Sequence, residues 1–231
     1  MIISGTRLVG GKYITGGTVT NGLTMWLDAA NPASYSGSGT TWSDLSGNGA
    51  NQTLVNAPTY TSGTPAYFTF NNVSAQYSTG STINVVPGSA YTKSVWFRLN
   101  SNTDNNLVSG DTGGHFMYFA GTGTLYAGHS NVMPYNQFGS VTAFSLNTWY
   151  YAAVTFSTTA GIKLYVNDVL DNANAGFTTA HTGNGSTNLA CFGPGGNLLN
   201  GRIGEVYCYN RPLTAGEVLQ NFNATRDRYG L

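Results

Sequence analysis

Charge is scarce in this chain of 231 residues. Charged residues make up 8% of the composition, and nine basic residues balance nine acidic ones. No Lys/Arg cluster occurs, so the sequence offers no electrostatic surface for a nucleic-acid backbone or an anionic membrane. We therefore expect no nucleic-acid partner, and solubility must come from Ser, Thr, Asn and Gly.

Long apolar runs are also missing. No stretch approaches the roughly 18 residues that span a bilayer, which predicts no membrane insertion. Residues 1–7 lack the continuous apolar segment of a signal peptide, so we expect no conventional secretion. Cysteine is limited to Cys191 and Cys208, for which we expect free thiols. A cross-strand disulfide stays open, because sequence does not supply the distance between them.

Glutamate occurs only twice, as Glu205 and Glu217. Glycosidases typically need two carboxyl groups, an acid and a partner. Glu217 is better explained as a helix-capping residue, so we expect no enzymatic activity. The three histidines, His115, His129 and His181, lie in separate Gly-rich contexts without metal-ligand spacing. We expect them to be solvated loop residues.

Short runs rich in Val, Tyr, Phe, Trp and Thr alternate with Gly, Asn, Ser and Pro clusters from residue 22 onward. This rhythm is typical of an all-β sandwich or barrel. The clearest predicted strands are Leu23–Leu27, Ala66–Phe70, Lys93–Leu99, Phe116–Ala120, Trp149–Phe156, Ile162–Val166 and Ile203–Tyr209. Alternation along the last of these indicates one buried and one solvated face. Asn167-Asp168 predicts a hairpin turn.

The remaining segments complete the predicted organisation. A helix is predicted over Thr214–Asn223, where Thr214 and Glu217 have the spacing of a capping box. We expect residues 1–21 to form an N-terminal arm that either frays or packs on a neighbouring subunit or edge strand. Residues 22–231 form a single domain.

Four stretches in sequence order resemble one family. They are residues 23–32 (LTMWLDAANP) with 42–49 (WSDLSGNG), residues 91–99 (YTKSVWFRL), residues 147–156 (NTWYYAAVTF) with 161–168 (GIKLYVND), and residues 200–218. Together they resemble the laminin-G-like, concanavalin A-like lectin jelly-roll superfamily. The resemblance implies an all-β fold, a two-sheet antiparallel jelly-roll sandwich with one short C-terminal helix.

The end of the chain carries a second resemblance. Val218–Leu231 is similar to the ends of such domains in tailed-bacteriophage virion proteins. It implies a non-enzymatic capsid decoration, tail or fibre component, assembled in the host cytoplasm, with a lectin-like domain for host-surface carbohydrate. We then expect a homo-oligomer that contacts other virion proteins through the N-terminal arm. The alternatives are a freestanding extracellular or cell-surface lectin or adhesion module, and a glycoside hydrolase of the same fold.

Two kinds of binding site are predicted. Sugar recognition uses an aromatic face beside groups that bond hydroxyls, and the candidate residues are Tyr35, Tyr126, Asn131, Tyr135, Asn136, Gln137 and Phe138. Each tyrosine could equally be core cover. Calcium prefers carboxylate and carbonyl oxygens. The family resemblance points to Asp44 and Glu205 as ligands, although Asp44 could cap its own turn and Glu205 could pair with Arg202 or Arg211. The cluster of Asp104 and Asp111 is a second calcium loop or an ordinary turn.

Overall fold

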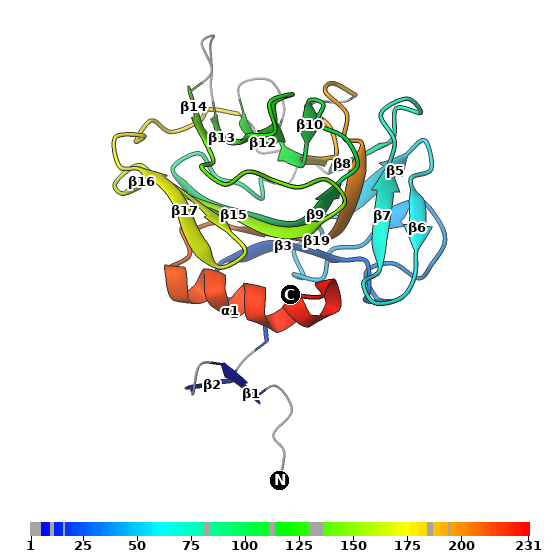
Figure 1. The fold of residues 1–231 in the computed structure, drawn as a ribbon, viewed down its shortest axis with the longest axis horizontal. Coiled ribbons are helices and arrows are strands. Elements are labelled where there is room, and N and C mark those ends of the chain that lie inside the picture. Colours follow the sequence, from blue (N-terminus) through cyan, green and yellow to red (C-terminus); the bar gives the residue numbers. More distant parts are fainter. Residues whose placement is uncertain are drawn as a thin grey trace.

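Antiparallel strands form the two layers of this computed structural model, and a C-terminal helix covers the outer face of one layer (Figure 1). The structure describes residues 6–9, 12–15, 17–80, 84–110, 114–129, 136–183, 187–193 and 195–231. The elements are β1 (Thr6–Val9), β2 (Lys12–Thr15), β3 (Leu23–Asp28), β4 (Thr41–Trp42), β5 (Gln52–Val55), β6 (Thr59–Thr61), β7 (Tyr67–Phe70), β8 (Tyr77–Gly80), β9 (Ala90–Leu99), β10 (Asn105–Asn106), β11 (Val108–Ser109), β12 (His115–Phe119), β13 (Leu125–His129), β14 (Asn136–Gly139), β15 (Trp149–Ser157), β16 (Gly161–Val166), β17 (Val169–Asn174), β18 (Asn188–Leu189), β19 (Gly201–Tyr209), α1 (Ala215–Thr225) and the 3-10 helix η1 (Arg226–Tyr229).

The two layers are unequal. One is an eight-stranded sheet in the order β17-β16-β15-β9-β19-β7-β6, with β3 also paired to β19. Opposite it lie a five-stranded sheet, β11-β18-β8-β5-β4, and a four-stranded sheet, β10-β12-β13-β14. The predicted jelly-roll sandwich is confirmed, as are the seven clearest predicted strands, with bounds shifted by a few residues.

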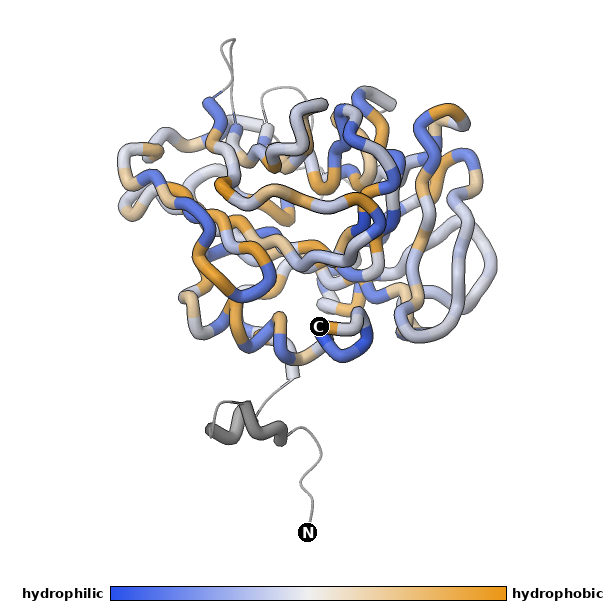
Figure 2. The backbone as a smooth tube through the Cα atoms, in the orientation of Figure 1, coloured by the Kyte–Doolittle hydropathy of each residue, from blue (hydrophilic) through white to orange (hydrophobic). Residues whose placement is uncertain are grey.

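The main core lies between the layers. Successive strand residues point to opposite faces, so Tyr91, Val95 and Phe97 of β9 all face inward, where Phe68 and Phe156 from other strands join them. Figure 2 shows hydrophobic segments (orange) among the strands in the middle of the molecule. Burial of such large aromatic side chains is a dominant favourable contribution to folding.

A second core lies on the outer face of the eight-stranded sheet, beneath α1 and η1. The Trp96 ring stacks on Tyr229 at 4.1 Å and on Phe222 at 5.6 Å between centroids, and its Nε1 donates to Thr225 Oγ1 at 2.8 Å. Tyr207 of β19 belongs to the same cluster and is fully buried. The predicted solvated face of this strand is therefore wrong, because the helices cover it.

A β-bulge in strand β19 changes which of its residues face the main core. Its pairing with β9 shifts register between Ile203 and Glu205, so Ile203 and Val206 both face the main core. A Cβ atom at Gly204 would lie 2.4 Å from the Tyr229 hydroxyl. Only glycine leaves room at this bulge for Tyr229 to pack so closely.

The predicted local features are present. Thr214 and Glu217 form the capping box of α1, and Asn167 adopts a left-handed conformation with φ 51° in its turn. Cys191 and Cys208 are both buried and are not joined by a disulfide. No helix in the described ranges is long and apolar enough to cross a membrane.

Candidate functional site

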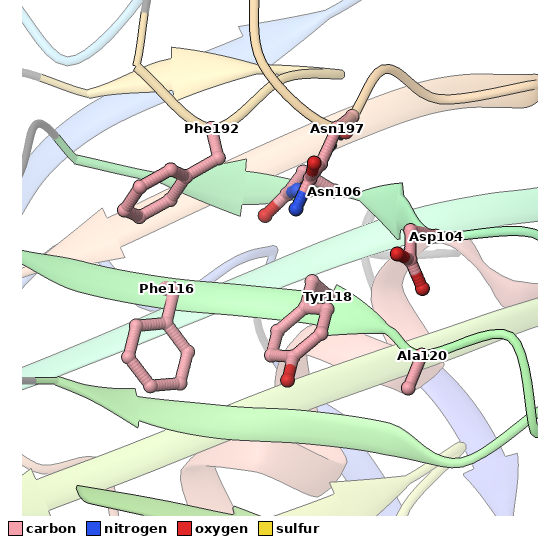
Figure 3. Close-up of a pocket in the computed structure, with 7 residues that line it drawn as sticks. All are labelled: Asp104, Asn106, Phe116, Tyr118, Ala120, Phe192 and Asn197. Carbon is pink, nitrogen blue, oxygen red and sulfur yellow. Dashed lines mark hydrogen bonds between the residues drawn. The ribbon is translucent and has the colours of Figure 1, made fainter. Parts of the chain in front are cut away.

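A pocket of about 300 Å³ opens beside β12, under the loop of residues 192–197 (Figure 3). This volume is at the lower end of the range typical of small-ligand pockets. The lining residues are Asp104, Asn106, Phe116, Tyr118, Ala120, Phe192 and Asn197. Three aromatic rings thus lie next to two amides and one carboxylate, drawn from residues 104–106, 116–120 and 192–197.

Strand β12 supplies the aromatic floor. Phe116 and Tyr118 are two residues apart, so they share the outer face of the strand. The Tyr118 ring stacks on Tyr126 of β13, with centroids 5.6 Å apart and an interplanar angle of 26°. Its hydroxyl donates to Gln137 Oε1 of β14 at 2.8 Å. These two contacts fix the ring orientation before any ligand arrives.

The polar lining residues are of two kinds, one that holds the loop in place and two that are exposed in the pocket. The Asn106 side chain donates to the Asn197 carbonyl at 3.0 Å and accepts from Ser109 Oγ at 2.8 Å, so its amide is used within the protein. Asp104 is exposed and accepts through Oδ1 from the Gly121 backbone N–H at 3.0 Å. Asn197 is also exposed. Asn106 therefore holds the loop, whereas Asp104 and Asn197 are available to a ligand.

The two ends of the loop that carries Phe192 pair with each other as in a tight hairpin. The Phe192 N–H donates to the Gly196 carbonyl at 2.7 Å, and the Gly196 N–H returns a bond to the Phe192 carbonyl at 3.1 Å. A Cβ atom at position 196 would lie 2.6 Å from the Phe192 carbonyl oxygen, so the closure depends on glycine. The hairpin places the half-buried Phe192 ring across from Phe116 (Figure 3).

The sugar-binding residues predicted from sequence are only partly brought together. Tyr126 and Gln137 support the pocket through Tyr118. Phe138 packs against the main core, and Asn136 is exposed at the start of β14. Asn131 and Tyr135 lie outside the described residues.

Tyr35 is not an exposed sugar-stacking residue. It is 7% exposed, its ring lies 4.8 Å from that of Phe68, and its hydroxyl donates to the Gly39 carbonyl. It covers the core instead. The sequence interpretation missed the aromatic pair of Phe116 and Tyr118, although two rings on the outward face of an already apolar strand are an unusual pattern.

Asp44, predicted as a calcium ligand, caps its own turn. Its carboxylate accepts bonds from the backbone N–H groups of Trp26, Ser46 and Ala50, and from the Ser46 hydroxyl. Because these donors occupy both oxygens, the residue does not fit a calcium site. Asp104 lines the pocket, and Asp111 lies outside the described residues. Within the ranges that the structure describes, no three His, Cys, Asp or Glu residues are grouped to hold a metal.

Glu205, the other predicted calcium ligand, is fully buried beneath the C-terminal helices. Its Oε1 accepts from Trp26 Nε1 at 3.2 Å and from the Tyr207 hydroxyl, while Oε2 has no partner within the described part. Burial, and then the neighbouring Asp28, raise the pKa of Glu205 above its usual value. Neither arginine predicted as its partner forms an ion pair with it in the described ranges.

The three histidines were predicted to be solvated loop residues, and this is wrong. His115, His129 and His181 are each at most 4% exposed and gather around the ring of Tyr91 in the main core. His181 lies 5.8 Å from His115 and 5.4 Å from His129 between ring centroids. His115 and His129 are cross-strand partners on the inward faces of β12 and β13.

Lys93 joins this buried cluster. Its Nζ donates to the Val108 carbonyl and to His115 Nδ1, both at 3.1 Å. Burial lowers the pKa of Lys93 well below its usual value. Burial, followed by repulsion from Lys93, lowers the pKa of His115. Burial also lowers the pKa of His129, to about 4, and that of His181. The cluster lies on the core side of β12, opposite the pocket.

Comparisons with known proteins agree with this fold. Residues 62–219 match a family model described as the concanavalin A-like lectin/glucanases superfamily. The binding domain of Paraclostridial mosquitocidal protein 1 aligns at a TM-score of 0.70 and 19% identity, over 89% of this chain and 52% of that chain. Botulinum neurotoxin type C, whose cell entry depends on two ganglioside molecules, aligns at a TM-score of 0.67 and 11% identity. This alignment covers 89% of this chain and 52% of the toxin chain.

A third structure, Trypanosoma rangeli sialidase in complex with the inhibitor DANA, aligns at a TM-score of 0.66 and 14% identity, over 94% of this chain and 35% of the sialidase. The chain therefore spans about half or less of the length of these proteins. No curated protein sequence matches it.

Proposed function

The chain belongs to the concanavalin A-like lectin/glucanases superfamily, and from this premise we propose that it binds carbohydrate in the pocket beside β12. The observation that carries the proposal is the lining itself, in which Phe116, Tyr118 and Phe192 lie next to exposed Asp104 and Asn197. A sugar ring presents an apolar C–H face and a rim of hydroxyls, and this lining offers a partner for each.

The parts of the pocket have distinct tasks in this proposal. The ring of Tyr118, already oriented by Tyr126, provides a flat surface for stacking, and Phe192 closes on the sugar from the loop. Asp104 and Asn197 accept hydrogen bonds from hydroxyls, and the Asn197 amide also donates. Since these groups are held by strands and a closed hairpin, little ordering cost falls on binding.

The distribution of carboxylates supports binding rather than hydrolysis. Among the described lining residues, Asp104 is the only carboxylate, whereas a typical glycosidase needs two across the scissile bond. Asp28 and Glu205 interact with each other, but they are buried beneath the C-terminal helices. Release of reducing sugar from any polysaccharide in a broad panel would favour the hydrolase alternative.

A glycan array tests the proposal. The wild-type protein should bind at least one class of oligosaccharide, and Phe192→Ala should weaken that binding by tenfold or more, because aromatic contacts contribute about 1.4 kcal/mol or more. Tyr67→Ala is the matched control, since Tyr67 is a half-buried aromatic on β7 in the other layer. Equal loss in both variants, or no binding by the wild type, contradicts the proposal.

We further propose the setting predicted from the C-terminal resemblance, a capsid decoration, tail or fibre component of a tailed bacteriophage. Gln220 Nε2 donates to the Gly17 carbonyl, and the Val19 N–H donates to Asn221 Oδ1, both at 2.8 Å. Residues 17–21 are thus attached beside α1, on the opposite side of the molecule from the four-stranded sheet (Figure 1). Attachment of residues 17–21 on that side leaves the pocket clear.

Sedimentation and cryo-EM of purified particles test this setting. Symmetric multimers, or density for the domain on virions, are the expected result. A strict monomer that is absent from purified virions contradicts it.

A further inference from the structure

Positive charge is nearly absent around the pocket. All lining residues come from the stretch between Leu99 and Gly201, which contains one Lys or Arg, Lys163, and four Asp. Lys163 is on β16, in the eight-stranded sheet of the opposite layer. This count comes from the whole sequence, so it includes the residues that the structure does not describe.

The other basic side chains of residues 22–231 also have partners elsewhere. Arg98, on β9 of the eight-stranded sheet, donates to Asn147 Oδ1, and the Arg226 guanidinium packs over Phe222. The Arg202 guanidinium packs over Tyr67 on the eight-stranded sheet, and Arg211 binds Glu217 at the start of α1. Arg228 binds Asp28. The Lys93 amine is fully buried on the core side of β12, where it donates inward.

An acidic sugar therefore lacks a partner for its carboxylate here. Proteins hold carboxylates with Arg or Lys, best with the paired donors of a guanidinium. Among the lining residues that the structure describes, Asp104 is the single charged one. A second carboxylate beside it meets like-charge repulsion and loses its hydration without compensation.

Resting on the proposed carbohydrate-binding function, we propose that the pocket selects neutral sugars and rejects glycans that present a sialic or uronic acid, with Asp104 as the discriminating residue. Neutral hydroxyls donate to Asp104, whose Oδ2 carries no hydrogen bond from the described residues, and the C–H faces stack on Tyr118 and Phe192. The same carboxylate that binds a neutral sugar excludes an acidic one.

The test compares matched glycans. Neutral oligosaccharides and the same oligosaccharides capped with sialic acid are titrated against the full chain at about 0.15 M salt, where exposed charges are screened beyond about 8 Å. The capped glycans should bind about tenfold more weakly or worse. Asp104→Asn should reduce this ratio to about threefold or less, since the amide removes the charge and keeps an oxygen for the Gly121 N–H.

Asp168→Asn is the matched control. Asp168 lies in the turn between β16 and β17, away from the pocket, so this variant loses the same charge and should keep the wild-type ratio. Equal or tighter binding of the capped glycans by the wild type overturns the inference and leaves carbohydrate binding intact. An unchanged ratio in Asp104→Asn also overturns it. Failure to bind any glycan contradicts the proposed function itself.

Discussion

Ionisable side chains with no access to water determine how this molecule responds to pH. Burial, and then the neighbouring charges that include Lys93, lower the pKa values of His115, His129 and His181, which favours their neutral forms in the folded protein. Glu205 behaves in the opposite way, because burial and Asp28 raise its pKa. The buried histidines of the main core therefore resist protonation, whereas the buried glutamate of the second core resists losing its proton.

We predict that acid destabilises the protein. The unfolded chain takes up protons on histidine below about pH 6.5 and the folded chain does not, so stability falls as pH drops from about 6.5 towards 4. His129, with a pKa of about 4, accounts for a loss of about 3 kcal/mol of unfolding free energy once the pH is below that pKa. Urea denaturation at a series of pH values measures the loss.

The Glu205→Gln variant separates the effect of the histidines from that of Glu205. Because its pKa is raised, Glu205 contributes stability that is fully present below pH 4.5 and is lost as pH rises. This contribution partly masks the loss of stability that the histidines cause on acidification. The variant removes this opposing contribution, so its stability should fall more steeply on acidification than that of the wild type. Stability that is flat or rises towards pH 4 in the variant would show that the histidines are not buried as described.

At the scale of elements, local patterns were readable in the sequence and non-local ones were not. The positions of the clearest strands and the capping box of Thr214 and Glu217 depend on neighbouring residues, and both were predicted correctly. The covered face of β19 was missed, because the position of the helix over it is set by packing. His115 was missed because flanking glycines suggested a loop, although its spacing from Met117 and Phe119 places it on the inward face.

The pocket illustrates the same limit. Tyr126 and Gln137 were predicted because aromatic and amide residues are close in the sequence there. Asn106, Tyr118 and Phe192 meet only through the pairing of β10 with β12 and the placement of the hairpin, which no local pattern reports.

We predict that the 192–197 hairpin can be disabled without unfolding the domain. Gly196→Ala places a Cβ 2.6 Å from the Phe192 carbonyl oxygen and so opens the hairpin. Glycan binding should weaken by tenfold or more, while the unfolding free energy changes by about 1 kcal/mol or less, as is usual for exposed loops. Gly193→Ala is the control within the loop, since nothing lies within 4 Å of its Cβ, although φ of 54° adds some strain. Equal binding by Gly196→Ala and wild type would contradict this role.

At the scale of the whole molecule, the proposed attachment side and the proposed binding pocket lie on opposite layers. Helix α1 and the attached residues 17–21 lie on one side, and the four-stranded sheet with its pocket lies on the other (Figure 1). Such an arrangement suits a domain that is fixed at one end and presents a ligand site at the other. It also explains why both faces of the eight-stranded sheet are apolar, since one faces each core.

The most direct test of carbohydrate binding in this pocket is an NMR titration of the 24.4 kDa chain with the neutral oligosaccharide that gives the strongest array signal. We predict saturable chemical-shift changes concentrated at Tyr118, Phe192, Asn197 and Asp104, while the shifts of α1 stay unchanged. Shift changes confined to the α1 side, or none at any concentration of any glycan tested, would contradict it.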